Sequence, residues 1–237
     1  MRNQTEILGD DVSFHTTSWT LVRSAGNLES LDALIRIYWK PLYFFVRQRG
    51  YDNETAKDIV QEFLAVLLER NAFAKADPGR GRFRTFLLAA LSNFLKDYSK
   101  SASRHKRGGG QSILSLDFES GESEYRLEVA AGETPENVLN RAWARNLWRQ
   151  ALSDLKGDPA HLEAFRLYLQ DVDYATISAR TGLSKSAAKV AVHRLKGQLR
   201  DLVTRYIGAT ASNPEEMRAE ITEFLELLGS SPPKAPA

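Results

Sequence analysis

Apolar residues recur at three- and four-residue spacing along most of the chain, which is the pattern of helices with one buried face. It predicts helices over about residues 19–50, 53–68, 80–107, 135–155, 159–169, 174–180, 185–207 and 214–228. Pro41 interrupts the first of them. Because proline lacks a backbone N–H, we expect it to kink that helix or to start a new one. The predicted fold class is all-α.

Most of these helices begin directly after a residue whose side chain can accept hydrogen bonds from the free N–H groups of a first turn. The capping residues are Asp52 or Asn53, Thr134, Asp158, Asp173 and Ser184. Proline follows at positions 135 and 159, where its missing N–H is not needed. Local chemistry therefore supports the starts that the periodicity predicts.

Residues 111–134 contain few large apolar side chains and follow three glycines at 108–110, so we predict a mostly unstructured linker there. The predicted organisation is two helical domains joined by a flexible acidic linker, the second domain containing a helix-turn-helix. The parts are a flexible lead-in (1–18), a first helical domain (19–107), the Gly-rich and acidic linker (108–134), a second helical domain (135–207), and a C-terminal helix with a Pro-rich tail (208–237).

Composition narrows the class of protein. The 237 residues are 43% hydrophobic and 26% charged, which is ordinary for a globular chain. There is no cysteine, so disulfides and thiolate chemistry are excluded. No run approaches the roughly 20 apolar residues that span a bilayer, and the first residues lack the layout of a signal peptide. We therefore expect a cytoplasmic protein that binds no membrane.

The net charge of +2 hides an uneven distribution. Residues 80–107 are basic, residues 117–136 are acidic, and the chain turns basic again past residue 180. In the first basic stretch the cations alternate with Phe83, Phe86, Phe94 and Tyr98. Cations interleaved with aromatics suit single-stranded or opening nucleic acid, although a solvated basic face is the alternative.

Two further patterns carry candidate binding chemistry. Asp173 caps a short helix, Gly182 makes a tight turn and Ser184 caps a long basic helix, which is the helix-turn-helix pattern. An incidental helical hairpin is the alternative. Earlier in the chain, Asp58, Gln61, Glu62 and Glu69 form a polar stripe at helical spacing, and spacing alone favours a solvated face.

Signs of catalysis are missing from the sequence. The four histidines are scattered without a second ligand at metal-site spacing, and no glycine-rich loop is built to hold a phosphate. We expect no enzyme, no metal, no cofactor and no small-molecule substrate.

Three blocks, in order, resemble a bacterial RNA polymerase sigma factor of the extracytoplasmic-function type. Residues 38–42 with 58–63 are similar to the family's helix that docks on the clamp helices of the polymerase largest subunit. Residues 83–87 with 93–97 are similar to the segment that opens and reads the minus-ten element, and Phe86 stands where many relatives carry tryptophan. Residues 174–177, 182–184 and 189–195 are similar to the domain that reads the minus-thirty-five element. The long acidic linker and the C-terminal helix look like a variant subgroup.

The resemblance implies site residues of three kinds. Those expected to bind polymerase are Asp58, Gln61 and Glu62. Those expected to capture the strand at the minus-ten element are Arg82, Arg84, Phe86, Asn93, Lys96, Lys100 and Arg104. Those expected to read the minus-thirty-five element are Lys185, Ser186, Lys189, His193, Arg194 and Lys196.

The partners implied are core RNA polymerase and promoter DNA. Either an anti-sigma protein or the helix over 214–228 is a candidate for holding the factor inactive, and the acidic linker is either a spacer or a nucleic-acid mimic that threads an RNA path. Two other classes stay open at this point. One is a free-standing helix-turn-helix regulator whose residues 19–107 serve dimerisation or sensing, and the other is an RNA-binding factor.

Overall fold

The computed structural model describes residues 28–70, 72, 82–101, 116–129, 132–211 and 213–229. Every regular element in these ranges is an α-helix, as predicted. The helices are α3 (Leu28–Gln48), α4 (Asn53–Glu69), α5 (Phe83–Ser101), α6 (Phe118–Glu128), α7 (Pro135–Ser153), α8 (Pro159–Leu169), α9 (Tyr174–Thr181), α10 (Lys185–Gly208) and α11 (Pro214–Gly229). Within these ranges no helix is long and apolar enough to cross a membrane.

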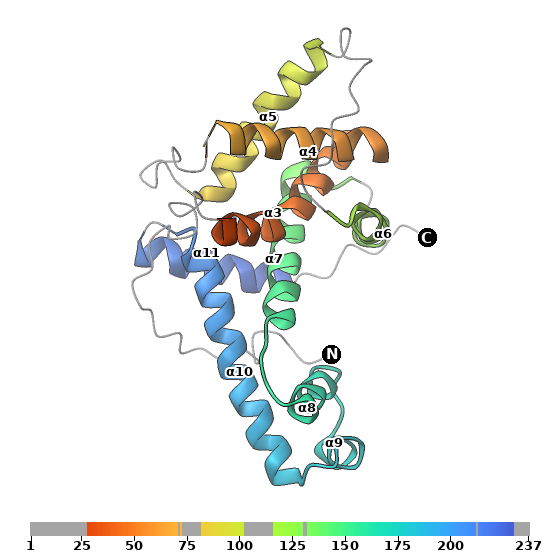
Figure 1. Cartoon of the computed structure of the whole chain (residues 1–237), viewed down its shortest axis with the longest axis vertical. Coiled ribbons are helices and arrows are strands. Elements are labelled where there is room, and N and C mark those ends of the chain that lie inside the picture. The colour runs from red at the N-terminus through yellow and green to blue at the C-terminus, as the bar shows by residue number, and fades with distance from the viewer. Residues whose placement is uncertain are drawn as a thin grey trace.

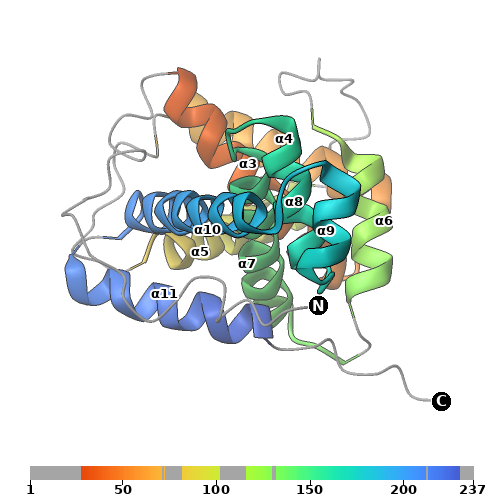
Figure 2. The same ribbon diagram turned by 90° about the horizontal axis from the view of Figure 1, so that it is seen from below.

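The centre of the fold is the packing of α7 on α3, the most extensive contact between two helices (Figure 1). Helices α4 and α5 lie at one end of the molecule, while α8, α9 and the first half of α10 lie at the opposite end. Helix α11 packs on α7 and α10, on the other side of α7 from α6 (Figures 1 and 2). One cluster of buried side chains runs through these helices.

Helix α3 continues through Pro41 instead of ending there. In a regular helix the N–H of residue 41 would donate to the carbonyl of Ile37, and proline has no N–H to donate. The side chain of Asn146 on α7 replaces that donor: its Nδ2 lies 2.9 Å from the carbonyl oxygen of Ile37 and 2.6 Å from that of Arg36. A polar side chain of α7 thus repairs the break in α3.

The capping residues act as predicted. The side chains of Asp52, Thr134, Asp158, Asp173 and Ser184 each accept a backbone N–H from the first turn that follows. Because each cap satisfies donors that would otherwise lack partners, these starts could be predicted to within one residue, whereas α5, predicted from about residue 80, begins at Phe83.

The prediction of a mostly unstructured linker is wrong for residues 118–128, which form α6 and pack on α3. Its buried stripe runs at helical spacing through Phe118, Gly121 and Glu122, with Tyr125 partly buried. Only two of these four are large apolar residues, so the sequence carries no clear helical periodicity there. Gly121 permits close packing, since a Cβ there would lie 3.1 Å from the ring of Trp39. The linker residues 102–115 lie outside the described part of the chain.

Candidate functional site

The turn between α9 and α10 has the local geometry that its sequence requires. Gly182 ends α9 with φ of 73°, a left-handed conformation that costs a residue with a Cβ about 1–2 kcal/mol. Ser184 then caps α10, and Ile177 and Val192 are buried where the two helices meet. The turn therefore fixes how α10 leaves α9.

Helix α10 projects most of its predicted contact residues into solvent. The exposed ones are Lys185, Ser186, Lys189, His193 and Arg194. Lys196 is only partly exposed, and its ammonium lies 4.7 Å from the ring centre of Tyr168. One large apolar residue that is exposed on α10 was not predicted: Val190, which is 49% exposed. The signal in the sequence is a large apolar side chain that lies outside the buried stripe of the helix.

The polar stripe on α4 is at the surface, with Asp58 and Glu62 exposed and Gln61 partly buried. Tyr98 of α5 lies nearby: burial, and then the negative charges of Glu62 and Asp58, raise the pKa of its hydroxyl. The Tyr98 ring stacks on Phe94 and meets Tyr51 edge-on. The stripe therefore borders an aromatic surface contributed by α5.

The minus-ten candidates on α5 fall into two groups. Asn93, Lys96 and Lys100 are exposed toward the C-terminal end of the helix. Phe86 is partly buried and stacks on Phe83, with ring centres 5.9 Å apart. Arg104 lies outside the described residues.

Arg82 and Arg84, at the other end of α5, are held by α11. Arg84 is 5% exposed, and its Nη2 lies 2.8 Å from Glu220 Oε2 and 3.0 Å from Glu223 Oε2. The Nε of Arg82 lies 3.0 Å from Glu220 Oε1, and its Nη1 pairs with Glu223. We name these four residues the arginine–glutamate cluster. In this arrangement the Arg84 guanidinium is not available to a phosphate, whereas the Arg82 side chain stays 36% exposed with its Nε and Nη1 held by the two glutamates.

An aromatic and an amide of α7 complete the surroundings of Arg84. Its guanidinium carbon lies 3.7 Å from the ring centre of Trp143, and its Nη1 donates to Asn140 Oδ1 at 3.1 Å. Phe224 of α11 meets the same Trp143 ring edge-on at 5.9 Å. Four segments, the start of α5 together with α7, α11 and Tyr38 of α3, therefore meet around one buried cation.

The electrostatics of the cluster follow from burial. Burial raises the pKa of the Glu220 carboxyl, and the positive charge of Arg84 offsets this only in part. Burial also acts on Glu223, but there the two arginines prevail and lower its pKa. Burial disfavours the charged form of Arg84, yet Glu220 and Glu223 raise its pKa overall. The cluster is a desolvated set of charges that depend on one another.

The two glutamates of this cluster were not predicted as site residues. Glu220 is 4% exposed and lies between Met217 and Phe224 in the apolar stripe of α11. A carboxylate at a stripe position is the signal that could have identified it, because a buried acid needs a partner cation.

Two acids of α6, Glu122 and Glu124, also have partners within the chain. Glu122 accepts from the Tyr43 hydroxyl at 2.7 Å and from the Arg47 guanidinium at 2.9 Å. Glu124 pairs with Lys40 and Arg149. The hydrogen bonds from Arg47 and Tyr43 outweigh burial and lower the pKa of Glu122 to about 2. A spacer and a threading nucleic-acid mimic both suppose an extended segment, whereas residues 118–128 are docked.

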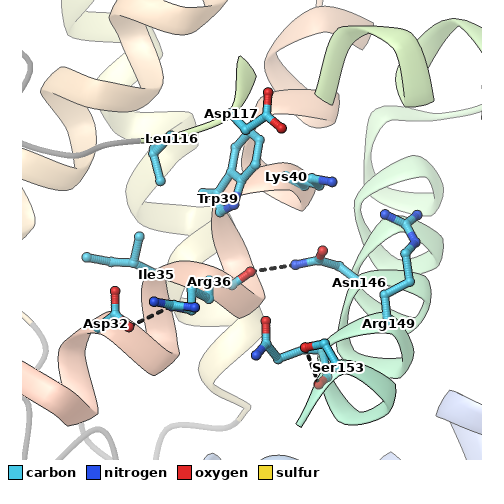
Figure 3. Close-up of a pocket in the computed structure, with 11 residues that line it drawn as sticks. Asp32, Ile35, Arg36, Trp39, Lys40, Leu116, Asp117, Asn146, Arg149 and Ser153 are labelled. Atoms are coloured by element: carbon cyan, nitrogen blue, oxygen red, sulfur yellow. Dashed lines mark hydrogen bonds and ion pairs between the residues drawn. The ribbon is translucent and has the colours of Figure 1, made fainter. Parts of the chain in front are cut away.

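A cavity of about 780 Å³ lies between α3, α7 and the start of α6 (Figure 3). Its lining includes Arg36, Lys40 and Arg149, which pair with acids of the chain, Arg36 with Asp32 and the other two with Glu124. Asn146 points across the cavity to the carbonyl of Arg36 (Figure 3). The cations of the cavity are thus already neutralised. Among the described residues, no group of three or more His, Asp or Glu side chains could hold a metal ion.

Comparison with known proteins gives no further guidance, since no protein-family model, curated protein or solved structure matches the chain.

Proposed function

We propose that the chain is a sigma factor: it binds core RNA polymerase, directs it to promoters, and helps to open the DNA. The observation that carries the proposal is the exposed polar face of α10, which follows the glycine turn and the Ser184 cap. An exposed polar face on a helix that follows a tight turn supports a role in the major groove. The proposal takes α9 and α10 as a helix-turn-helix.

Recognition would divide between two kinds of contact. Lys185, Lys189 and Arg194 would bind phosphates, which gives affinity that falls with rising salt. Ser186 and His193 would reach base edges, each good contact being worth about 1–3 kcal/mol of discrimination. Such a helix binds duplex DNA and needs no single strand.

The exposed acids of α4 supply the second part of the proposal. Asp58 and Glu62 are solvent-exposed and lie beside partly buried aromatics, so they offer charge and apolar area together. This combination is typical of a protein-docking surface. We assign it to core polymerase, and we assign the exposed Asn93, Lys96 and Lys100 to the opened strand.

Substitutions of Asp58 and Glu62 on α4 test the proposed binding to core polymerase. Asp58→Asn with Glu62→Gln removes two negative charges with little change of shape, and Glu119→Gln with Glu226→Gln removes the same charge from exposed positions on other helices. We expect the first pair to weaken binding to purified core polymerase by about tenfold or more. The control pair should bind core like the wild type, and all three proteins should bind duplex DNA equally.

A free-standing helix-turn-helix regulator is the second candidate. Two observations favour it: the polar face of α10 is exposed, and Arg84 near the start of α5 is buried against α11 and cannot reach a DNA strand. Under this function the Asp58 and Glu62 variant would have no phenotype in core binding, because no such binding would exist.

A further inference from the structure

The side of α11 that faces α5 carries its negative charge inward. Glu220 is 4% exposed and Glu223 has a side chain 26% exposed, and both are directed at Arg82 and Arg84. Two carboxylates one helical turn apart thus meet two guanidinium groups two residues apart. Guanidinium groups bind phosphate oxygens and carboxylate oxygens with the same geometry, so either anion suits this pair.

The contact is incompletely satisfied. Arg84 Nε is buried and has no hydrogen-bond partner. Glu220 Oε1 lies 3.0 Å from Arg82 Nε but without hydrogen-bond geometry, and it too has no hydrogen-bond partner. Buried ion pairs add little net stability even when complete, because desolvation offsets their attraction. The charges therefore position α11 but add little to its stability, which comes mainly from the buried apolar side chains of Met217, Ile221 and Phe224.

The surroundings of Arg84 would still suit nucleic acid if α11 were absent. The Trp143 ring and the Asn140 amide would remain on α7, Arg84 would remain on α5, and Arg82 would remain directly before α5. An aromatic ring beside cations offers both stacking and phosphate binding, which is what single-stranded nucleic acid requires. Helix α11 fills this position with Phe224 against the ring and with carboxylates on the arginines.

We infer that α11 competes with single-stranded DNA for Arg82 and Arg84: Glu220 and Glu223 occupy these two arginines, and α11 must leave before a DNA backbone can bind there. This regulation rests on the proposed function, which assigns Arg82 and Arg84 to the opened promoter strand. Docked α11 and a bound single strand exclude one another. The docked state has low affinity for the opened strand, and displacement of α11 accompanies binding.

The test uses the full chain and two charge-matched double variants. Glu220→Gln with Glu223→Gln removes the competing charge, while Glu215→Gln with Glu226→Gln removes the same charge from exposed positions on the same helix. The probe is a fluorescein-labelled single-stranded DNA of mixed sequence. We expect the first variant to bind it about 5- to 150-fold more tightly than the wild type, the range of a typical coupling between sites. The control should stay within about twofold of the wild type.

Hydrogen exchange of the wild-type protein gives a readout that needs no substitution. Adding the same single-stranded DNA should remove protection from the amides of residues 214–229 and leave those of α7 protected. If these amides stay protected while DNA is bound, and both variants bind DNA equally, α11 is a fixed part of the core and the inference is overturned.

Binding to core polymerase, measured on the same three proteins, separates the inference from the function on which it rests. A chain that supports promoter-specific transcription with α11 still docked loses only the inference. A chain whose α11 is displaced by DNA but which never associates with core keeps the competition and loses the sigma role.

Discussion

Asn146 offers a test of how α3 passes through Pro41. Replacing it by leucine keeps the side-chain size but removes the donor that reaches the carbonyls of Ile37 and Arg36. The Ile37 carbonyl then lies buried without a partner, and leaving such a group unsatisfied costs about 1–3 kcal/mol. In a Pro41→Ala background, alanine supplies its own N–H to the same carbonyl, so the Asn146→Leu change should cost less.

The assay is a double-mutant cycle of free energies of unfolding, each obtained by linear extrapolation from urea titrations. The cycle isolates the coupling, so the effect of Pro41→Ala alone need not be known. We expect a coupling of about 1–2 kcal/mol between the two positions, within the range for residues that share a partner.

Gln48 provides the control pair. Its amide also donates to a backbone carbonyl, that of Glu133, but this acceptor does not depend on Pro41. Gln48→Leu and Pro41→Ala should therefore be additive within about 0.3–0.5 kcal/mol. A coupling equally small between Pro41 and Asn146 would refute the argument that α7 repairs the interruption of α3.

Two further predictions concern local structure. Glu122→Gln should destabilise the protein by about 2–4 kcal/mol at neutral pH, because Arg47 then loses its buried partner. Folding lowers the pKa of Glu122 from 4.5 to about 2, so its contribution to the free energy of unfolding is present above pH 4.5 and is lost as the pH falls toward 2. The difference in free energy of unfolding between the two proteins should therefore disappear near pH 2. A difference that stays constant with pH would contradict this prediction. Gly182→Ala should destabilise the protein by about 1–2 kcal/mol, because φ is 73° at this position. Gly197→Ala inside α10 should stabilise the protein by up to about 1 kcal/mol, because an added Cβ there meets nothing within 4 Å. Melting temperatures that shift in the same direction for both variants would contradict these predictions.

Features that depend only on neighbouring residues in the chain could be predicted from the sequence. Helix starts at Asp52, Thr134, Asp173 and Ser184 depend on one side chain and the turn that follows, so they could be predicted without knowing the fold. The exposed face of α10 is likewise the complement of its own buried stripe.

The features that the sequence did not reveal depend on partners far along the chain. Helix α6 docks on α3 partly because Glu122 meets Arg47 and Tyr43, 75 and 79 residues earlier. Arg84 is buried because Glu220, 136 residues later, is brought to it by α11. Charges of opposite sign in distant segments look like two solvated surfaces until the fold pairs them.

The most direct test of the central claim is transcription in vitro from genomic DNA fragments, using purified core polymerase with and without this chain. We predict specific start sites that appear only when the chain is present, together with a stable complex of chain and core. A chain that never associates with core and adds no start site, yet binds duplex DNA tightly on its own, would contradict the account and favour the free-standing regulator.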